Sequence, residues 1–186
     1  MAEHDYGYTK WGKDWVRFAE SLRQTRPDPQ LPSARRMARD GKVQITFDGR
    51  TVRAVVHRGR GTAVVTIEVA PMSPGVTAEI SRQLSGIQPL LTDDLYQAIA
   101  DAGHPPAPVL DSVDCSCPAA GPRCVHELAV YYDLARRIDD DPRIALDVQG
   151  FFRASAGGGQ APAEATARRW IALNSLDPAA YFTAAG

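Results

Sequence analysis

The sequence predicts an α+β protein: a small antiparallel β meander packed with helices, followed by a Cys-x-Cys…Cys-x-His zinc finger that leads into a helix. Three observations predict this class. Segments 42–47, 51–57 and 62–69 alternate apolar and polar residues or are rich in β-branched residues, which is typical of strands. Other segments repeat apolar residues at helical spacing. All three cysteines of the chain fall within ten residues, beside a histidine.

The first helix is predicted from apolar residues that recur at steps of four, three and four, namely Trp11, Trp15, Phe18 and Leu22. It should stop before Pro27, and residues 27–32 are expected to form an extended, Pro-rich connector. The aromatic face of this helix is expected to pack on the protein's own core. The alternative is an exposed face that binds a partner.

The meander has turn residues at 48–50 and 58–61, between its predicted strands. After it, we expect one helix through Ile80, Leu84 and Ile87. A second helix should begin at an N-cap Thr92 and carry an apolar stripe of Leu95, Ile99 and Ala102. Residues 109–117 are expected to be extended.

A strong apolar stripe predicts a long helix from Cys124 to the acidic residues 139–141, and a further helix is expected over 144–152. Three glycines at 157–159 predict a linker, and 163–173 predict a last short helix. The expected organisation is an N-terminal helix and connector at 1–34, a main unit at 35–155 with its finger at 113–139, and a C-terminal linker and helix at 156–186.

The overall charge of −1 excludes a protein that binds polyanions over its whole surface. No apolar run approaches the roughly 18 residues that a membrane span needs, and the polar N-terminus has no signal-peptide core. We therefore expect no membrane partner. Clustered cysteines suit a metal site in a reducing compartment better than a disulfide scaffold, so a cytoplasmic protein is expected.

Charge is distributed unevenly along the chain. Residues 35–60 carry eight basic and two acidic side chains, whereas 61–186 carry eight basic and fifteen acidic ones. The basic segment is a candidate nucleic-acid interface, because arginines on strands and turns can reach phosphates. The alternative, that arginine is simply the preferred solvated surface charge of this chain, is slightly ahead. The candidates are Arg35, Arg36, Arg39, Lys42, Arg50, Arg53, Arg58 and Arg60.

The metal ligands are predicted to be Cys115, Cys117, Cys124 and His126. Zn²⁺ prefers four sulfur or nitrogen ligands in a tetrahedron, and this segment supplies them as two pairs. Pro118 favours a turn after the first pair. The second pair should stand at a helix start, where backbone N–H groups stabilise a thiolate. Arg123 is expected to offset the negative charge of three thiolates.

This zinc is expected to be structural, because a catalytic zinc keeps one position open and four protein ligands close the shell. Position 130 is valine, so the His-Glu-x-x-His pattern of metalloproteases is absent. There is no credible phosphate-binding glycine loop and no acid–base pair. The sequence therefore predicts a protein that is not an enzyme and has no small-molecule substrate.

From Cys115-Ser116-Cys117-Pro118 to Cys124-Val125-His126 and its apolar helix, the chain resembles a SWIM-type zinc finger, bacterial branch. Only 115–132 is motif-specific. The resemblance implies a DNA- or protein-interaction module, since such bacterial proteins are often associated with SNF2-type helicases.

Three hypotheses follow. The first is a zinc module that contacts DNA and is accessory to an SNF2-type helicase. The second is an adaptor, which docks through the finger helix or the face of Trp11, Trp15 and Phe18 without touching nucleic acid. The third, least favoured, is a thiol redox switch at Cys115 and Cys117.

Overall fold

The computed structural model describes residues 6–20, 28–59, 61–84, 90–118 and 123–153. Its centre is a four-stranded antiparallel sheet in the order β1-β2-β3-β4. The predicted meander is confirmed. Its strands are β1 (Val43–Asp48), β2 (Thr51–Arg58) and β3 (Gly61–Val69), and β4 (Leu110–Cys115) pairs with β3 in register Val65 to Cys115.

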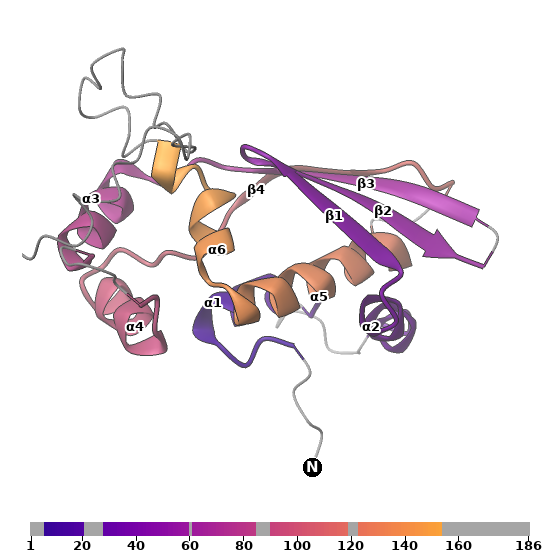
Figure 1. Cartoon of the computed structure of the whole chain (residues 1–186), viewed down its shortest axis with the longest axis horizontal. Helices are drawn as coiled ribbons and strands as arrows, with labels where there is room; N and C mark the ends of the chain where they lie inside the picture. The colour runs from indigo at the N-terminus through magenta and orange to yellow at the C-terminus, as the bar shows by residue number, and fades with distance from the viewer. Residues whose placement is uncertain (1–5, 21–27, 60, 85–89, 119–122, 154–186) are drawn as a thin grey trace, which may run out of the picture.

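The longest helix, α5 (Val125–Asp140), runs along one face of this sheet (Figure 1). Inward residues of the strands, such as Val52, Val65 and Ile67, are fully buried. They share one core with Leu128, Leu134 and other residues of α5. The outward residues of the strands are mostly polar, which is usual for an antiparallel sheet with one solvated face.

Helix α1 (Lys10–Ala19) and helix α2 (Leu31–Arg39) pack against α5. Trp11 and Trp15 are 2% and 0% exposed, so the aromatic face of α1 belongs to the protein's own core and is not a free docking face. Gly12 lets α1 approach α5 closely. The Asp139 carboxylate of α5 accepts hydrogen bonds from the backbone N–H groups of Gly7 at 2.6 Å and Thr9 at 2.9 Å.

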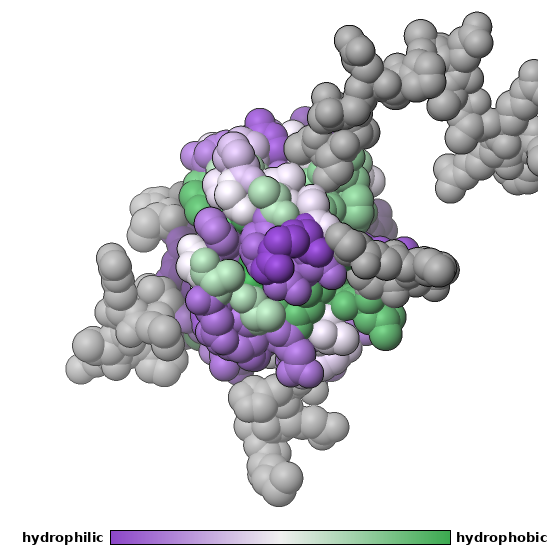
Figure 2. All heavy atoms as spheres, turned by 90° about the vertical axis from the view of Figure 1, so that its left-hand side faces the viewer, coloured by the Kyte–Doolittle hydropathy of each residue, from purple (hydrophilic) through white to green (hydrophobic). Residues whose placement is uncertain are grey.

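Helix α3 (Pro74–Gln83) and helix α4 (Asp93–Asp101) connect β3 to β4, at the end of the sheet that lies away from the start of α5 (Figure 1). Thr92 is the N-cap of α4, as predicted, and its side chain accepts from the Leu95 N–H. Figure 2 views this end of the molecule, where hydrophilic residues cover the middle of the face and hydrophobic residues form separate patches around it. No helix among the described residues is long and apolar enough to cross a membrane.

Two helix predictions are wrong. Residues 31 and 32 are not an extended connector but the first turn of α2, because a proline in the first turn of a helix removes an N–H that has no helical partner. Helix α6 (Arg143–Asp147) is shorter than predicted, because Gly150 has a φ of +77° and interrupts the chain before 151–153. Predictions for Leu22, Ile87, 157–159 and 163–173 lie outside the described residues.

Candidate metal centre

The first ligand pair lies where β4 ends. Cys115 is the last residue of β4, and its partner across the sheet is Val65. Ser116 continues the pairing with β3, because its N–H donates to the Val64 carbonyl at 2.9 Å and its Oγ accepts from the Val64 N–H at 2.9 Å. These bonds fix the backbone between Cys115 and Cys117. The edge of the sheet therefore sets the position of the first pair.

The second pair begins helix α5. Cys124 is the N-cap, and its Sγ accepts the Glu127 N–H at 3.5 Å. His126 lies in the first turn of the helix. Cys124 is 4% exposed, whereas the other three side chains are partly exposed. A sulfur at an N-cap lies close to the positive end of the helix dipole, which favours a thiolate there.

The four ligand atoms come together, as the spacing predicts. The Sγ atoms of the cysteines and one ring nitrogen of His126 all lie within 4.8 Å of one another. His126 Nδ1 is 3.9 Å from both Cys115 Sγ and Cys124 Sγ. Zn–S bonds of about 2.3 Å and Zn–N bonds of about 2.0 Å in a tetrahedron separate donor atoms by roughly 3.5–3.8 Å. The donor set therefore fits a tetrahedral ion after a small inward movement.

The protonation of the metal-free ligands follows from their burial. Burial raises the pKa of the Cys115 and Cys124 thiols, and the Glu127 N–H offsets this only in part at Cys124. Burial, and then the positive charge of Arg58, lower the pKa of His126. At neutral pH the metal-free Cys115 and Cys124 therefore hold neutral thiols, and His126 holds a neutral imidazole. A divalent metal must displace the thiol protons, so its affinity should increase with pH.

Two neighbouring side chains have roles that the sequence did not reveal. The Nη1 of Arg123 donates to the carbonyl oxygens of Phe18 at 2.9 Å and Ala19 at 3.3 Å, and these bonds leave its positive charge beside Cys124. These carbonyls end α1, so Arg123 ties the metal-site loop to that helix. Glu127 Oε1 lies 3.5 Å from Cys124 Sγ and can accept a hydrogen bond from the thiol.

Comparison of the chain with protein-family models, with curated proteins and with solved structures finds no match.

The basic segment does not form one surface. Arg35, Arg36 and Arg39 lie on α2, not on the meander. Arg50 stands at the β1–β2 turn and Arg58 at the far end of β2, so a strand of eight residues, or about 26 Å, separates them. Arg60 lies outside the described residues.

Several of these cations are already paired. Arg35 forms an ion pair with Glu20 and also donates to Tyr132 Oη at 3.1 Å. Arg50 donates to the Val69 carbonyl at 2.6 Å and forms an ion pair with Asp111. Both have protein partners, so their charges are partly neutralised before any ligand arrives.

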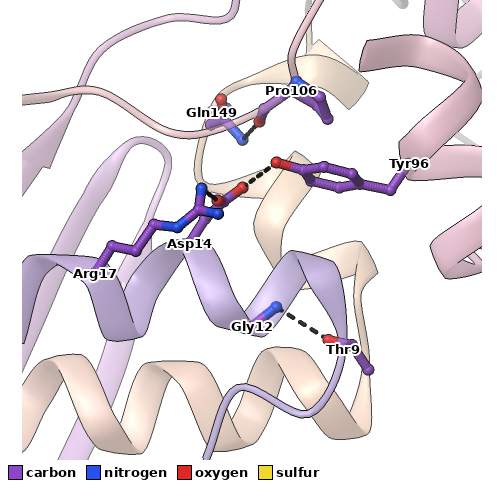
Figure 3. Close-up of polar contacts among 7 residues, drawn as sticks. All are labelled: Thr9, Gly12, Asp14, Arg17, Tyr96, Pro106 and Gln149. Carbon is purple, nitrogen blue, oxygen red and sulfur yellow. Dashed lines mark hydrogen bonds and ion pairs between the residues drawn. The ribbon is translucent and has the colours of Figure 1, made fainter. Parts of the chain in front are cut away.

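The sequence analysis does not predict a buried hydrogen bond that joins α1 to α4. The Asp14 carboxylate is 4% exposed and accepts a hydrogen bond from Tyr96 Oη at 2.5 Å, while Arg17 pairs with its other oxygen (Figure 3). Burial raises the pKa of Asp14, although the Tyr96 hydrogen bond and the Arg17 charge oppose this. No sequence signal identifies the pair, because Asp14 and Tyr96 are 82 residues apart.

Proposed function

We propose that the chain is a zinc-binding interaction module in which Cys115, Cys117, Cys124 and His126 hold one structural Zn²⁺. One observation carries the proposal: the four donor atoms lie within 4.8 Å of one another although they come from two separate elements. Three thiolates and an imidazole are a donor set that suits zinc.

In this role the ion would join the end of β4 to the start of α5. The ion would supply a Lewis-acid cross-link, and four protein ligands would fill its tetrahedron. A filled tetrahedron has no open position for a substrate. This supports a protein that is not an enzyme and whose activity is to present a surface.

We further propose that this surface contacts DNA, as an accessory to an SNF2-type helicase. The resemblance of 115–132 to a SWIM-type finger supports this partner class. Exposed cations that make no ion pair within the described residues, such as Lys42, Arg53 and Arg58, support direct contact with phosphates. The second candidate is an adaptor that binds protein alone. It cannot use the face of Trp11 and Trp15, because that face is buried.

The zinc proposal is tested by counting metal and thiols in the purified chain. We expect about one zinc per chain and three thiols that react slowly until a chelator is added. A chain with no bound metal and freely reactive thiols after growth in zinc-rich medium contradicts the proposal. A disulfide between Cys115 and Cys117 with no metal would favour the redox switch.

The DNA proposal is tested by titrating a labelled duplex with the zinc-loaded chain at 50 and 200 mM salt. Phosphate contacts release counterions, so the affinity should fall steeply with salt. A millimolar affinity that does not change with salt contradicts direct contact and favours the adaptor. Co-purification of a helicase from the native host then supports the adaptor.

A further inference from the structure

The two edges of the sheet differ in how well they are protected. β1 and β4 are the outer strands in the order β1-β2-β3-β4 (Figure 1). The pairing of β4 with β3 shifts register between Glu68 and Val69, and β4 carries two exposed aspartates, Asp111 and Asp114. Irregular pairing and charged side chains are means by which proteins keep a sheet edge from pairing with another strand. The middle of β1 has neither, because β1 pairs with β2 in continuous register over 43–48 and carries charge only near its ends.

The hydrogen bonds of β1 show which backbone groups face its open edge. The His57 N–H of β2 donates to the Lys42 carbonyl at 2.9 Å and extends the ladder by one pair. Hydrogen-bonded pairs alternate with non-hydrogen-bonded pairs in an antiparallel ladder. Every second residue from Lys42 onward therefore bonds to β2, whereas Val43, Ile45 and Phe47 direct their N–H and C=O groups outward. No other described residue bonds to these outward groups.

The side chains at this edge form an apolar row on one face and a charged pair on the other. Val43, Ile45 and Phe47 lie opposite fully buried residues of β2, so they point toward the core. Phe47 is nevertheless 37% exposed, because no further strand lies beside it. Lys42 and Asp48 are exposed at the two ends of β1, on the solvent face. Within the described part of the chain, neither forms an ion pair.

A second copy of β1 fits this edge if it runs antiparallel about a two-fold axis at Ile45. In this register Ile45 is opposite the partner's Ile45, and Phe47 is opposite the partner's Val43. The outward backbone groups of these residues then all pair, in about six hydrogen bonds. At both ends Lys42 lies opposite the partner's Asp48, which makes two favourable cross-strand charge pairs. A shift of two residues in either direction separates both charge pairs.

We propose that two copies of the chain associate through β1 in this register, so that their sheets join into one continuous sheet. The backbone bonds would supply affinity, and the cross-strand side-chain pairs would select the register. The helices of both copies would lie on the same side of the joined sheet, and Phe47 would pack beside the partner's Val43. The inference depends on neither the metal nor DNA. Of the exposed cations that support contact with phosphates, the pairing uses Lys42 and leaves Arg53 and Arg58.

The test measures the mass of the full chain by sedimentation equilibrium between about 5 and 500 µM, with charge reversals at the ends of β1. The wild type should form a dimer. Lys42→Asp and Asp48→Lys each place like charges opposite each other at both ends, so each should weaken the dimer about 10- to 100-fold. The matched control is Arg143→Asp, the same charge change at an exposed residue of α6, which should weaken it less than about twofold.

Two rescues identify the register. The double variant Lys42→Asp/Asp48→Lys restores opposite charges at both ends, and so does an equimolar mixture of the two single variants. Both should recover the wild-type dimer affinity. Within one chain Lys42 and Asp48 are six strand residues, or about 20 Å, apart, so an interaction inside the chain cannot produce the rescue. If the folded single variants dimerise as tightly as the wild type, or if neither rescue succeeds, the proposal is overturned.

Amide hydrogen exchange locates the interface independently. The Ile45 N–H, which faces the open edge, should be protected at about 500 µM and exchange rapidly at about 5 µM. The Gln44 N–H bonds to β2 and should be protected at both concentrations. A dimer whose Ile45 N–H exchanges rapidly uses another surface and overturns the proposal. A wild-type chain that stays monomeric at about 500 µM overturns it as well.

Discussion

Removing the metal should destabilise the start of α5 without unfolding the core. Leu128, Leu134 and Ile138 are fully buried in the core beneath the sheet, so we expect them to stay buried when the ion is removed. A ligand that binds only the folded state stabilises it by about 4 kcal/mol when its free concentration is 1,000 times its Kd. For a domain of this size each kcal/mol shifts Tm by about 3 °C, so chelation should lower Tm by about 12 °C.

Substitutions at two ligands separate metal binding from helix capping. Cys124 Sγ also accepts the Glu127 N–H as the N-cap of α5, and a serine hydroxyl can replace it in that role. Cys124→Ser and Cys117→Ser should therefore lose only the metal contribution. Cys124→Ala should lose about 1 kcal/mol more than Cys124→Ser, and this difference should persist in a chelator. At Cys117, which caps no helix, alanine and serine should differ by less than about 0.5 kcal/mol.

The assay is thermal and urea unfolding followed by circular dichroism, with zinc and with excess chelator. Two results would refute the reasoning. If chelation removes the metal and leaves Tm unchanged, the ion contributes no folding energy. If chelation abolishes most of the helical signal at 20 °C, the hydrophobic core does not hold the fold without the ion.

Two further predictions concern α1. A Cβ at Gly12 would clash with the Asp139 carboxylate and lie 3.0 Å from the Ala135 carbonyl oxygen. Gly12→Ala should therefore lower the free energy of unfolding in urea by about 3 kcal/mol. The control Gly61→Ala, whose Cβ has more room, should change it by less than about 1 kcal/mol. Equal costs for the two variants would contradict this close packing. Burial raises the pKa of Asp14, so the folded state binds the proton of the Asp14 carboxyl group more tightly than the unfolded state does. The stability that this proton contributes is therefore present below the unfolded pKa of about 3.9, and it is lost as pH rises through the folded pKa. Asp14→Asn should therefore gain stability relative to wild type between pH 4 and pH 7, and urea midpoints whose difference does not change with pH would refute the assignment.

Local sequence patterns predict most of the helices and strands, but they do not predict every strand pairing. The three meander strands were predictable because Val52, Ala54 and Val56 alternate with outward residues and short turns join the strands. Residues 109–117 were predicted to be extended, yet their pairing with β3 depends on contacts between residues more than 40 positions apart. The sequence analysis assigns residues 27–32 to an extended connector and so does not predict α2, although a proline in the first turn of a helix costs no hydrogen bond.

Charge along the sequence proved a poor guide to charge in space. The count over 35–60 treats eight cations as one set, whereas the fold places Arg35 against Glu20 and Arg50 against Asp111. Both acidic partners lie outside that segment. The metal ligands were predictable for the opposite reason, since all four lie within twelve residues and the chain needs little tertiary information to bring them together.

A metal at this site would have a local structural role, although the chain has a large core. The core beneath the sheet is built from the helices and the inward residues of the strands, and β4 ends at Cys115 beside this core. Between that point and α5 the sequence Ser116 to Arg123 offers no large apolar side chain, so burial cannot hold this connection. A tetrahedral ion would supply that constraint through four short bonds, and it would fix the orientation of His126. The Cys117→Ser and Cys124→Ser variants, each with and without a chelator, therefore test whether the ion holds this connection.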